Sequence, residues 1–163
     1  SMQMGQNPTN FWPGISPETI RKLIAKIGRC KKGWRIEKSI IEQMKTLRSK
    51  ITKHIYEWDS IILMAQVMDF YKRAEFAIME VDFFHANNRP VDTEWERRLT
   101  DQKSLLAELV SLRKTVIQHF SKRYCGDAFR EWCHDLFDLW EQKLKQCHKI
   151  CIKKKIAAQK IYS

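Results

Sequence analysis

Two residue pairs in this sequence place a carboxylate and a histidine at the i, i+3 spacing that puts both on one side of a helix. They are Asp82 with His85 and Glu131 with His134. Such pairs supply half of a carboxylate-bridged di-iron centre when two of them lie at the same level of a helical bundle. A further helix of about 30 residues connects the two pairs, so we expect them to lie on the order of 45 Å apart. At that distance they cannot share a metal.

Three cysteines near the C-terminus fall on nearly one helical face. They are Cys133, Cys147 and Cys151, and His148 follows the second. Cys147 and Cys151 could form half of a zinc site, but a structural zinc site normally combines two such ligand pairs from loops or knuckles. The sequence offers no second pair, and free cysteine is among the most commonly buried residue types. We therefore predict buried thiols in an apolar environment and no metal.

Nucleophilic catalysis needs a serine or cysteine within hydrogen-bond reach of an oriented base. His119 and Cys125 are close in the sequence, but residues six positions apart on a helix point in different directions. The chain contains no nucleophile-elbow, P-loop or dinucleotide-binding motif. We expect no enzymatic activity and no cofactor.

The composition favours a helical, intracellular protein. The chain has 163 residues, 44% of them apolar, but only five Gly and four Pro, which is too few for the many tight turns of a β-sandwich or barrel. No apolar run is long enough to span a membrane, and no secretory signal is present. An odd number of cysteines, five, favours reduced thiols and a nuclear or cytoplasmic location; a secreted helical cytokine is the competing class.

The predicted domain begins after an irregular lead. Residues 1–15 have no apolar periodicity and begin with Ser-Met, which is typical of a tag remnant, so a native targeting segment could have been removed. Ser16 and Pro17 are residue types that favour a helix N-cap and first turn. We predict a flexible lead over 1–15, a helix from Ser16 to about Arg29, and a single helical-bundle domain over 16–163.

A second helix is predicted from Trp34 to about Ala86, because this stretch contains neither Gly nor Pro. Its apolar residues alternate at spacings of four and three, the pattern of a buried bundle or coiled-coil seam. We expect this helix to be continuous or merely kinked; the alternative is a break at Asp59-Ser60, which could cap a new helix. The predicted seam residues are Ile40, Met44, Leu47, Ile51, His54, Trp58, Ile61, Ala65 and Met68.

Two more helices follow the predicted loop at 86–91. Asp92 is the expected cap of a helix that runs to about Tyr124, Gly126 ends it, and Asp127 caps the last helix. The fold class is therefore all-α, an elongated antiparallel bundle of four helices, or five if the second divides. The seam of the third helix is Trp95, Leu99, Gln102, Leu106, Leu109, Arg113, Val116 and Phe120, and the last helix presents Phe129, Trp132, Cys133, Leu136, Phe137, Trp140, Leu144, Cys147, Ile150 and Cys151.

The net charge of +11 is concentrated at the two ends of the chain. Residues 1–54 carry a net +9 and residues 143–163 a net +7, while 55–100 carry −4 and 101–142 carry −1. Basic surfaces attract nucleic acid, anionic lipid or acidic proteins. If the second helix divides, the two basic runs meet at one pole; if it is continuous, the C-terminal lysines lie near Glu80, Asp82 and Glu94. The candidate polyanion-binding residues are Lys31, Lys32, Arg35, Lys153, Lys154 and Lys155.

Two functions are compatible with this pattern. The first is a non-enzymatic protein–protein interaction domain, a scaffold module of a larger intracellular protein that docks a helix or peptide of a partner. The alternative is binding of nucleic acid or anionic membrane through the basic residues. A third interpretation, that the lysines only keep the surface soluble, also stays open, as do the oligomeric state and the partner.

Overall fold

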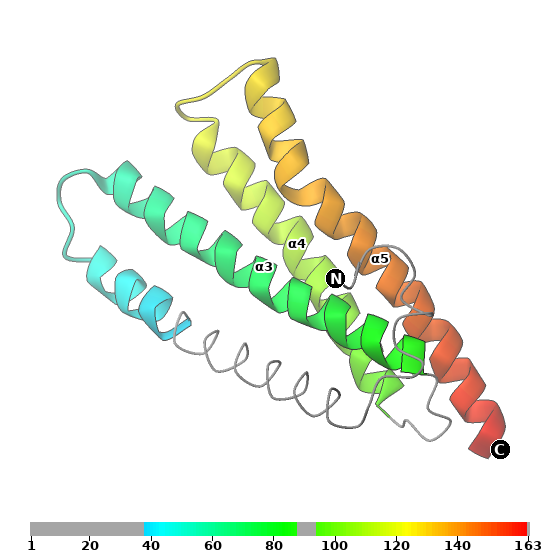
Figure 1. The fold of residues 1–163 in the computed structure, drawn as a ribbon. Helices are drawn as coiled ribbons and strands as arrows, with labels where there is room; N and C mark the ends of the chain where they lie inside the picture. Colours follow the sequence, from blue (N-terminus) through cyan, green and yellow to red (C-terminus); the bar gives the residue numbers. More distant parts are fainter. Residues whose placement is uncertain (1–37, 88–93, 163) are drawn as a thin grey trace, which may run out of the picture.

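The computed structural model describes residues 38–87 and 94–162, and all regular structure within these ranges is helical. A helix over 38–48 is followed by α3 (Ile55–Asn87), α4 (Trp95–Phe120) and α5 (Asp127–Tyr162). Figure 1 shows that α3, α4 and α5 run alternately down, up and down, while residues 38–48 fold back along α3. The predicted all-α elongated antiparallel bundle is confirmed. The predictions for 1–37 and for Asp92 lie outside the described residues.

The second helix is not continuous, and that prediction was wrong. The helix ends at Arg48 and α3 begins at Ile55, so the break covers residues 49–54 and ends five residues before the alternative break at Asp59-Ser60. No Gly or Pro marks the connection, and His54 takes a positive φ of 56°. Tertiary contacts close the hairpin instead: the guanidinium of Arg48 bonds both carboxylate oxygens of Asp59, with Nε to Oδ1 at 2.5 Å and Nη2 to Oδ2 at 3.2 Å.

The predicted seam of this segment is also largely wrong, because four of its apolar residues are exposed. Ile40, Leu47, Ile61 and Met68 keep 46–59% of their surface accessible. The core uses a second stripe of α3 that also alternates at four and three. At the same spacings, the predicted seam would continue along α3 at Lys72 and Glu75, which are charged. The second stripe stays apolar over five turns. It consists of Leu63, Val67, Phe70, Ala74, Ala77 and Val81.

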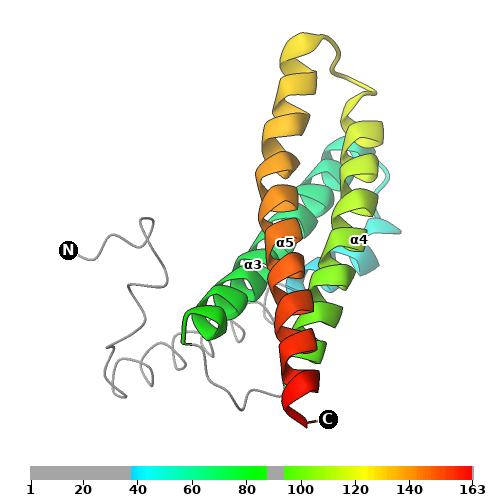
Figure 2. The same ribbon diagram turned by 90° about the vertical axis from the view of Figure 1, so that its right-hand side faces the viewer.

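The seams predicted for α4 and α5 are largely confirmed. Leu109 and Val116 of α4 pack with Phe137 and Leu144 of α5 in the central core cluster. A second cluster near the end of α3 joins Val81, Trp95 and Leu99 to Cys147 and Cys151. All three long helices contact one another (Figures 1 and 2). None of the helices in the described ranges has a stretch long and apolar enough to cross a bilayer.

The two polar seam residues of α4 differ in their partners. Arg113 donates from Nη2 to Asp138 Oδ1 and Glu141 Oε2 of α5, both at 3.0 Å. Gln102 is fully buried, and neither atom of its amide has a hydrogen-bond partner. Arg113 can therefore fix the register between α4 and α5, as polar seam groups do in coiled coils, but Gln102 has no such contact.

The turn between α4 and α5 is formed where the sequence predicts it. Helix α4 ends at Phe120, a turn earlier than the expected Tyr124, and α5 begins at Asp127. Gly126 has a φ of +93°, a conformation that costs other residues free energy but not glycine. The carboxylate of Asp127 accepts a hydrogen bond from Arg130 Nη2 at 2.6 Å.

Candidate binding surfaces

The two carboxylate–histidine pairs lie on different levels of the bundle. Asp82 faces Lys143 and Cys147 of α5 closely enough for their charges to interact. Glu131 precedes Cys147 by 16 residues on the same helix, about 24 Å. This distance is shorter than we expected from the sequence, but too long for shared ligation. Across residues 38–87 and 94–162, no cluster of three or more His, Cys, Asp or Glu could hold a metal ion.

The cysteines of α5 are buried, as predicted. Cys133, Cys147 and Cys151 are 0–6% exposed, and none forms a disulfide. Burial raises the pKa of the Cys147 thiol to about 12 and of the Cys151 thiol to about 11. Both thiols are therefore protonated at neutral pH, whereas metal binding and nucleophilic attack need the thiolate. Cys125 is exposed, and Cys30 lies outside the described residues.

A serine–histidine contact that the sequence did not predict joins α3 to the end of α4. Ser60 Oγ lies 2.7 Å from His119 Nε2, and the His119 ring stacks on Tyr56 with centroids 4.4 Å apart. Ser60 donates its own hydroxyl proton to the Tyr56 carbonyl at 2.8 Å, as serines inside helices often do. That geometry leaves His119 as the donor to Ser60 and argues for a structural contact. The sequence placed His119 and Cys125 on one helix, but Cys125 lies in the loop after α4.

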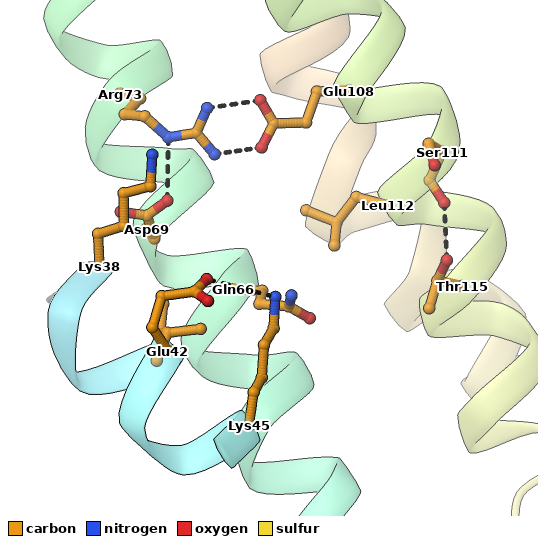
Figure 3. Close-up of a pocket in the computed structure, with 11 residues that line it drawn as sticks. Lys38, Glu42, Lys45, Gln66, Asp69, Arg73, Glu108, Ser111, Leu112 and Thr115 are labelled. Carbon is orange, nitrogen blue, oxygen red and sulfur yellow. Dashed lines mark hydrogen bonds and ion pairs between the residues drawn. The ribbon is translucent and has the colours of Figure 1, made fainter.

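A groove of about 460 Å³ opens between helix 38–48, α3 and α4, and we call it the charged groove. Figure 3 shows Arg73 at its upper end, with both terminal nitrogens on the Glu108 carboxylate and Nε donating to Asp69 Oδ2 at 2.9 Å. Helix 38–48 contributes Lys45 and Glu42, which form an ion pair at 3.7 Å, and Lys38. The lining therefore contains three cations and three carboxylates: Lys38, Lys45, Arg73, Glu42, Asp69 and Glu108.

Apolar side chains at spacings of three and four lie on the side of helix 38–48 away from the charged groove and in a second row on α3. We call this surface the exposed stripe: Ile40, Met44 and Leu47 of the first helix, with Trp58, Ile61, Ala65 and Met68 of α3. The two parts are joined where Trp58 Nε1 donates to the Met44 carbonyl at 3.3 Å. Ile40, Leu47, Ile61 and Met68 are about half exposed. Spacings of three and four make the stripe straight along each helix.

The C-terminal lysines lie beside the end of α3 and the start of α4. Lys155 forms an ion pair with Glu96 at 3.6 Å. Lys153 and Lys154 lie close enough to His85 for their charges to lower its pKa. Burial, followed by the charge of Lys154, lowers the pKa of His85. The sequence placed these lysines near Glu80, Asp82 and Glu94 only if the second helix were continuous, which it is not. Glu80 is instead engaged by Arg97 and Arg98. Lys31, Lys32 and Arg35 lie outside the described residues, so whether they meet the C-terminal run stays a prediction.

No protein-family model matches the chain, and no curated protein or solved structure does so either. Function therefore has to be inferred from the surfaces that the fold presents. The exposed stripe and the charged groove are two such surfaces, and each combines residues from more than one helix.

Proposed function

We propose that this chain is a non-enzymatic interaction domain that docks an amphipathic helix of another protein on the exposed stripe. The observation that carries the proposal is the exposure of Ile40, Leu47, Ile61 and Met68 at heptad spacing on two adjacent helices. Apolar side chains at such spacings form the holes into which the i, i+3, i+4 and i+7 residues of a partner helix insert. An extended peptide, with side chains alternating every two residues, would fit this repeat poorly.

The size of the exposed stripe supports one helix as the occupant rather than a second copy of the chain. Four half-exposed side chains present on the order of a few hundred Å², the size of patch that marks an interaction site on a monomer. A stable dimer of standard size buries about 800 Å² on each partner. A single docked helix needs less surface than that, so we favour a helix supplied by a different protein.

Site-specific photo-crosslinking tests this proposal in cells. Benzoylphenylalanine placed at Ile61 or Met68 should crosslink to segments of partner proteins that contain apolar residues at spacings of three and four. Val110 of α4 is 62% exposed and is the matched control position on another helix. Crosslinks at positions 61 and 68 that are no more frequent than at 110, or that lie in segments without heptad spacing, would refute helix docking on this stripe.

Charge introduced into the exposed stripe should prevent docking without unfolding the bundle. Ile61→Glu and Met68→Glu alter side chains that are 55% and 59% exposed, so they cost little packing. The partners crosslinked by the wild-type chain should be lost from the double variant and kept by Val110→Glu. Equal retention by both variants would count against the exposed stripe as the docking site.

A nuclear or cytoplasmic location is part of the same proposal. The four cysteines in the described residues are free thiols, and free thiols are typical of reducing compartments. The larger intracellular protein to which such a module would belong is likewise a proposal. Fractionation of cells that express the untagged full-length protein is the corresponding measurement.

Binding of nucleic acid or anionic membrane is the second candidate. Lys153 and Lys154 both lie close enough to His85 to lower its pKa, against the opposing charge of Asp82, so two of the candidate lysines lie beside the end of α3. Retention on RNA, DNA or anionic liposomes should be strong at low salt, fall steeply as salt increases, and be reduced by Lys153→Glu with Lys154→Glu. Absence of retention on all three at low salt would exclude this candidate.

A further inference from the structure

Asp69, one of the residues that line the charged groove, has a carboxylate oxygen that no group within residues 38–87 and 94–162 satisfies. Asp69 is only 7% exposed, and its Oδ2 accepts from Arg73, but its Oδ1 is buried without a hydrogen-bond partner. A buried acceptor left unpaired costs about 1–3 kcal/mol. A ligand that donates a hydrogen bond to Asp69 Oδ1 would recover that free energy.

The remaining charges of the groove show which kind of donor fits. Arg73 is shared between Asp69 and Glu108, so these three groups together carry one net negative charge. Glu42 and Lys45 neutralise each other at 3.7 Å. Lys38 supplies the balancing positive charge on the rim, and it forms no ion pair with any residue that the structure describes. Counted over the described residues alone, the groove thus offers one unmatched anion and one unmatched cation.

A simple cation or anion would satisfy one of these groups and be repelled by the other. We propose that the charged groove binds a small zwitterion whose ammonium group donates to Asp69 Oδ1 and whose carboxylate pairs with Lys38. An α-amino acid is the simplest member of this class. A volume of about 460 Å³ is within the range of small-molecule pockets, and Ile41 and Leu112 provide apolar lining for an aliphatic side chain. Because Asp69 Oδ1 is covered, binding requires a neighbouring side chain to move.

Titration of the ¹⁵N-labelled chain with L-leucine tests the zwitterion site by NMR. L-leucine should shift the amide resonances of Ser111, Leu112 and Thr115, which line the groove. L-leucinamide lacks the carboxylate and N-acetyl-L-leucine lacks the ammonium group, so each should bind about tenfold more weakly or worse, the loss of one charge-assisted hydrogen bond. Equal binding of either analogue, or no shift up to the solubility limit of L-leucine, would overturn the proposal.

Two variants separate this site from a non-specific effect. Asp69→Asn and Lys38→Gln should each weaken L-leucine binding about tenfold, whereas Asp135→Asn and Lys103→Gln change exposed residues of the same types outside the groove lining. Lys38 is an exposed residue, so its variant tests the site even if Asp69→Asn fails to fold. Unchanged binding by the folded groove variants, or equal weakening by the control variants, would contradict the assignment.

Discussion

At the scale of single residues, burial determines the reactivity of the cysteines. The pKa of Cys147 and of Cys151 is raised to about 12 and about 11 by burial, and the pKa of Cys133 is raised by the same cause. Iodoacetamide reacts with the thiolate, so at pH 7.5 it should modify the exposed Cys125 well before these three. Peptide mapping by mass spectrometry measures the order, with urea-unfolded protein as the control in which the differences disappear. Rapid native modification of Cys147 would contradict the packing around α5.

Gln102 is a polar residue whose environment predicts a stabilising substitution. Its amide is fully buried with neither nitrogen nor oxygen bonded. Gln102→Leu removes the unpaired donor and acceptor at similar volume and should raise the free energy of unfolding by about 1–3 kcal/mol. Urea denaturation measures the change, and Gln146→Leu on the exposed side of α5 is the matched control. A loss of stability would show that the Gln102 amide has a partner or a packing role after all.

His119 should make stability depend on pH. Burial and the charge of Lys122 lower the pKa of His119, although Asp59 opposes the shift. The unfolded chain, with a histidine pKa of about 6.5, therefore binds the proton more tightly than the folded chain. Above about pH 6.5, His119 is neutral in both states and the free energy of unfolding does not depend on its titration. As the pH decreases from about 6.5 through the pKa of His119 in the folded chain, the free energy of unfolding should fall. His85 is shifted in the same direction by burial and Lys154.

Variants of His119 isolate its contribution to that slope. His119→Gln should reduce the loss of unfolding free energy between about pH 6.5 and 5. His85→Gln, added to it, should reduce the remaining loss further. Urea denaturation at several pH values gives the slope directly. A slope that is unchanged in the His119→Gln variant would show that this ring is not the titrating group.

At the scale of elements, the hairpin between helix 38–48 and α3 depends on an unfavourable backbone conformation. His54 has a φ of 56°, and its side chain is 83% exposed, so little packing compensates for the strain. Glycine adopts this region without a steric penalty. His54→Gly should therefore raise the free energy of unfolding by up to about 1 kcal/mol, as measured by thermal and urea denaturation. A destabilised variant would indicate that the His54 side chain contributes more than its long 3.9 Å contact with Glu57 suggests.

At the scale of the whole molecule, both core clusters are built from α3, α4 and α5. The central cluster extends from Leu63 of α3 to Leu144 of α5, and the second surrounds Cys147. Helix 38–48 contributes one buried apolar residue, Ile41, which belongs to neither cluster. A fragment of residues 50–163 should therefore retain helical circular dichroism and unfold cooperatively, at lower stability than the full chain. A non-cooperative transition would show that the preceding residues are needed to complete the core.

How far the sequence could predict this fold depends on how many apolar stripes each helix carries. Helices α4 and α5 each have one dominant stripe, so the burial of Leu109, Val116, Phe137 and Leu144 followed from spacing alone. Helix α3 carries two stripes with the same four-three alternation, and the shorter of them was mistaken for the seam. The pattern contained the distinguishing signal, because only the buried stripe stays apolar beyond Met68.

The sequence by itself determined that the protein is an all-α bundle with buried cysteines, since composition and periodicity are local properties of the chain. The break at 49–54, the exposed stripe and the charged groove were decided by tertiary structure. Arg48 with Asp59 and Ser60 with His119 are contacts between residues 11 and 59 positions apart. No local sequence pattern marks such pairs, because the contacts form and stabilise the fold only when the helices pack together. The same packing determined which stripe of α3 is buried and which is exposed.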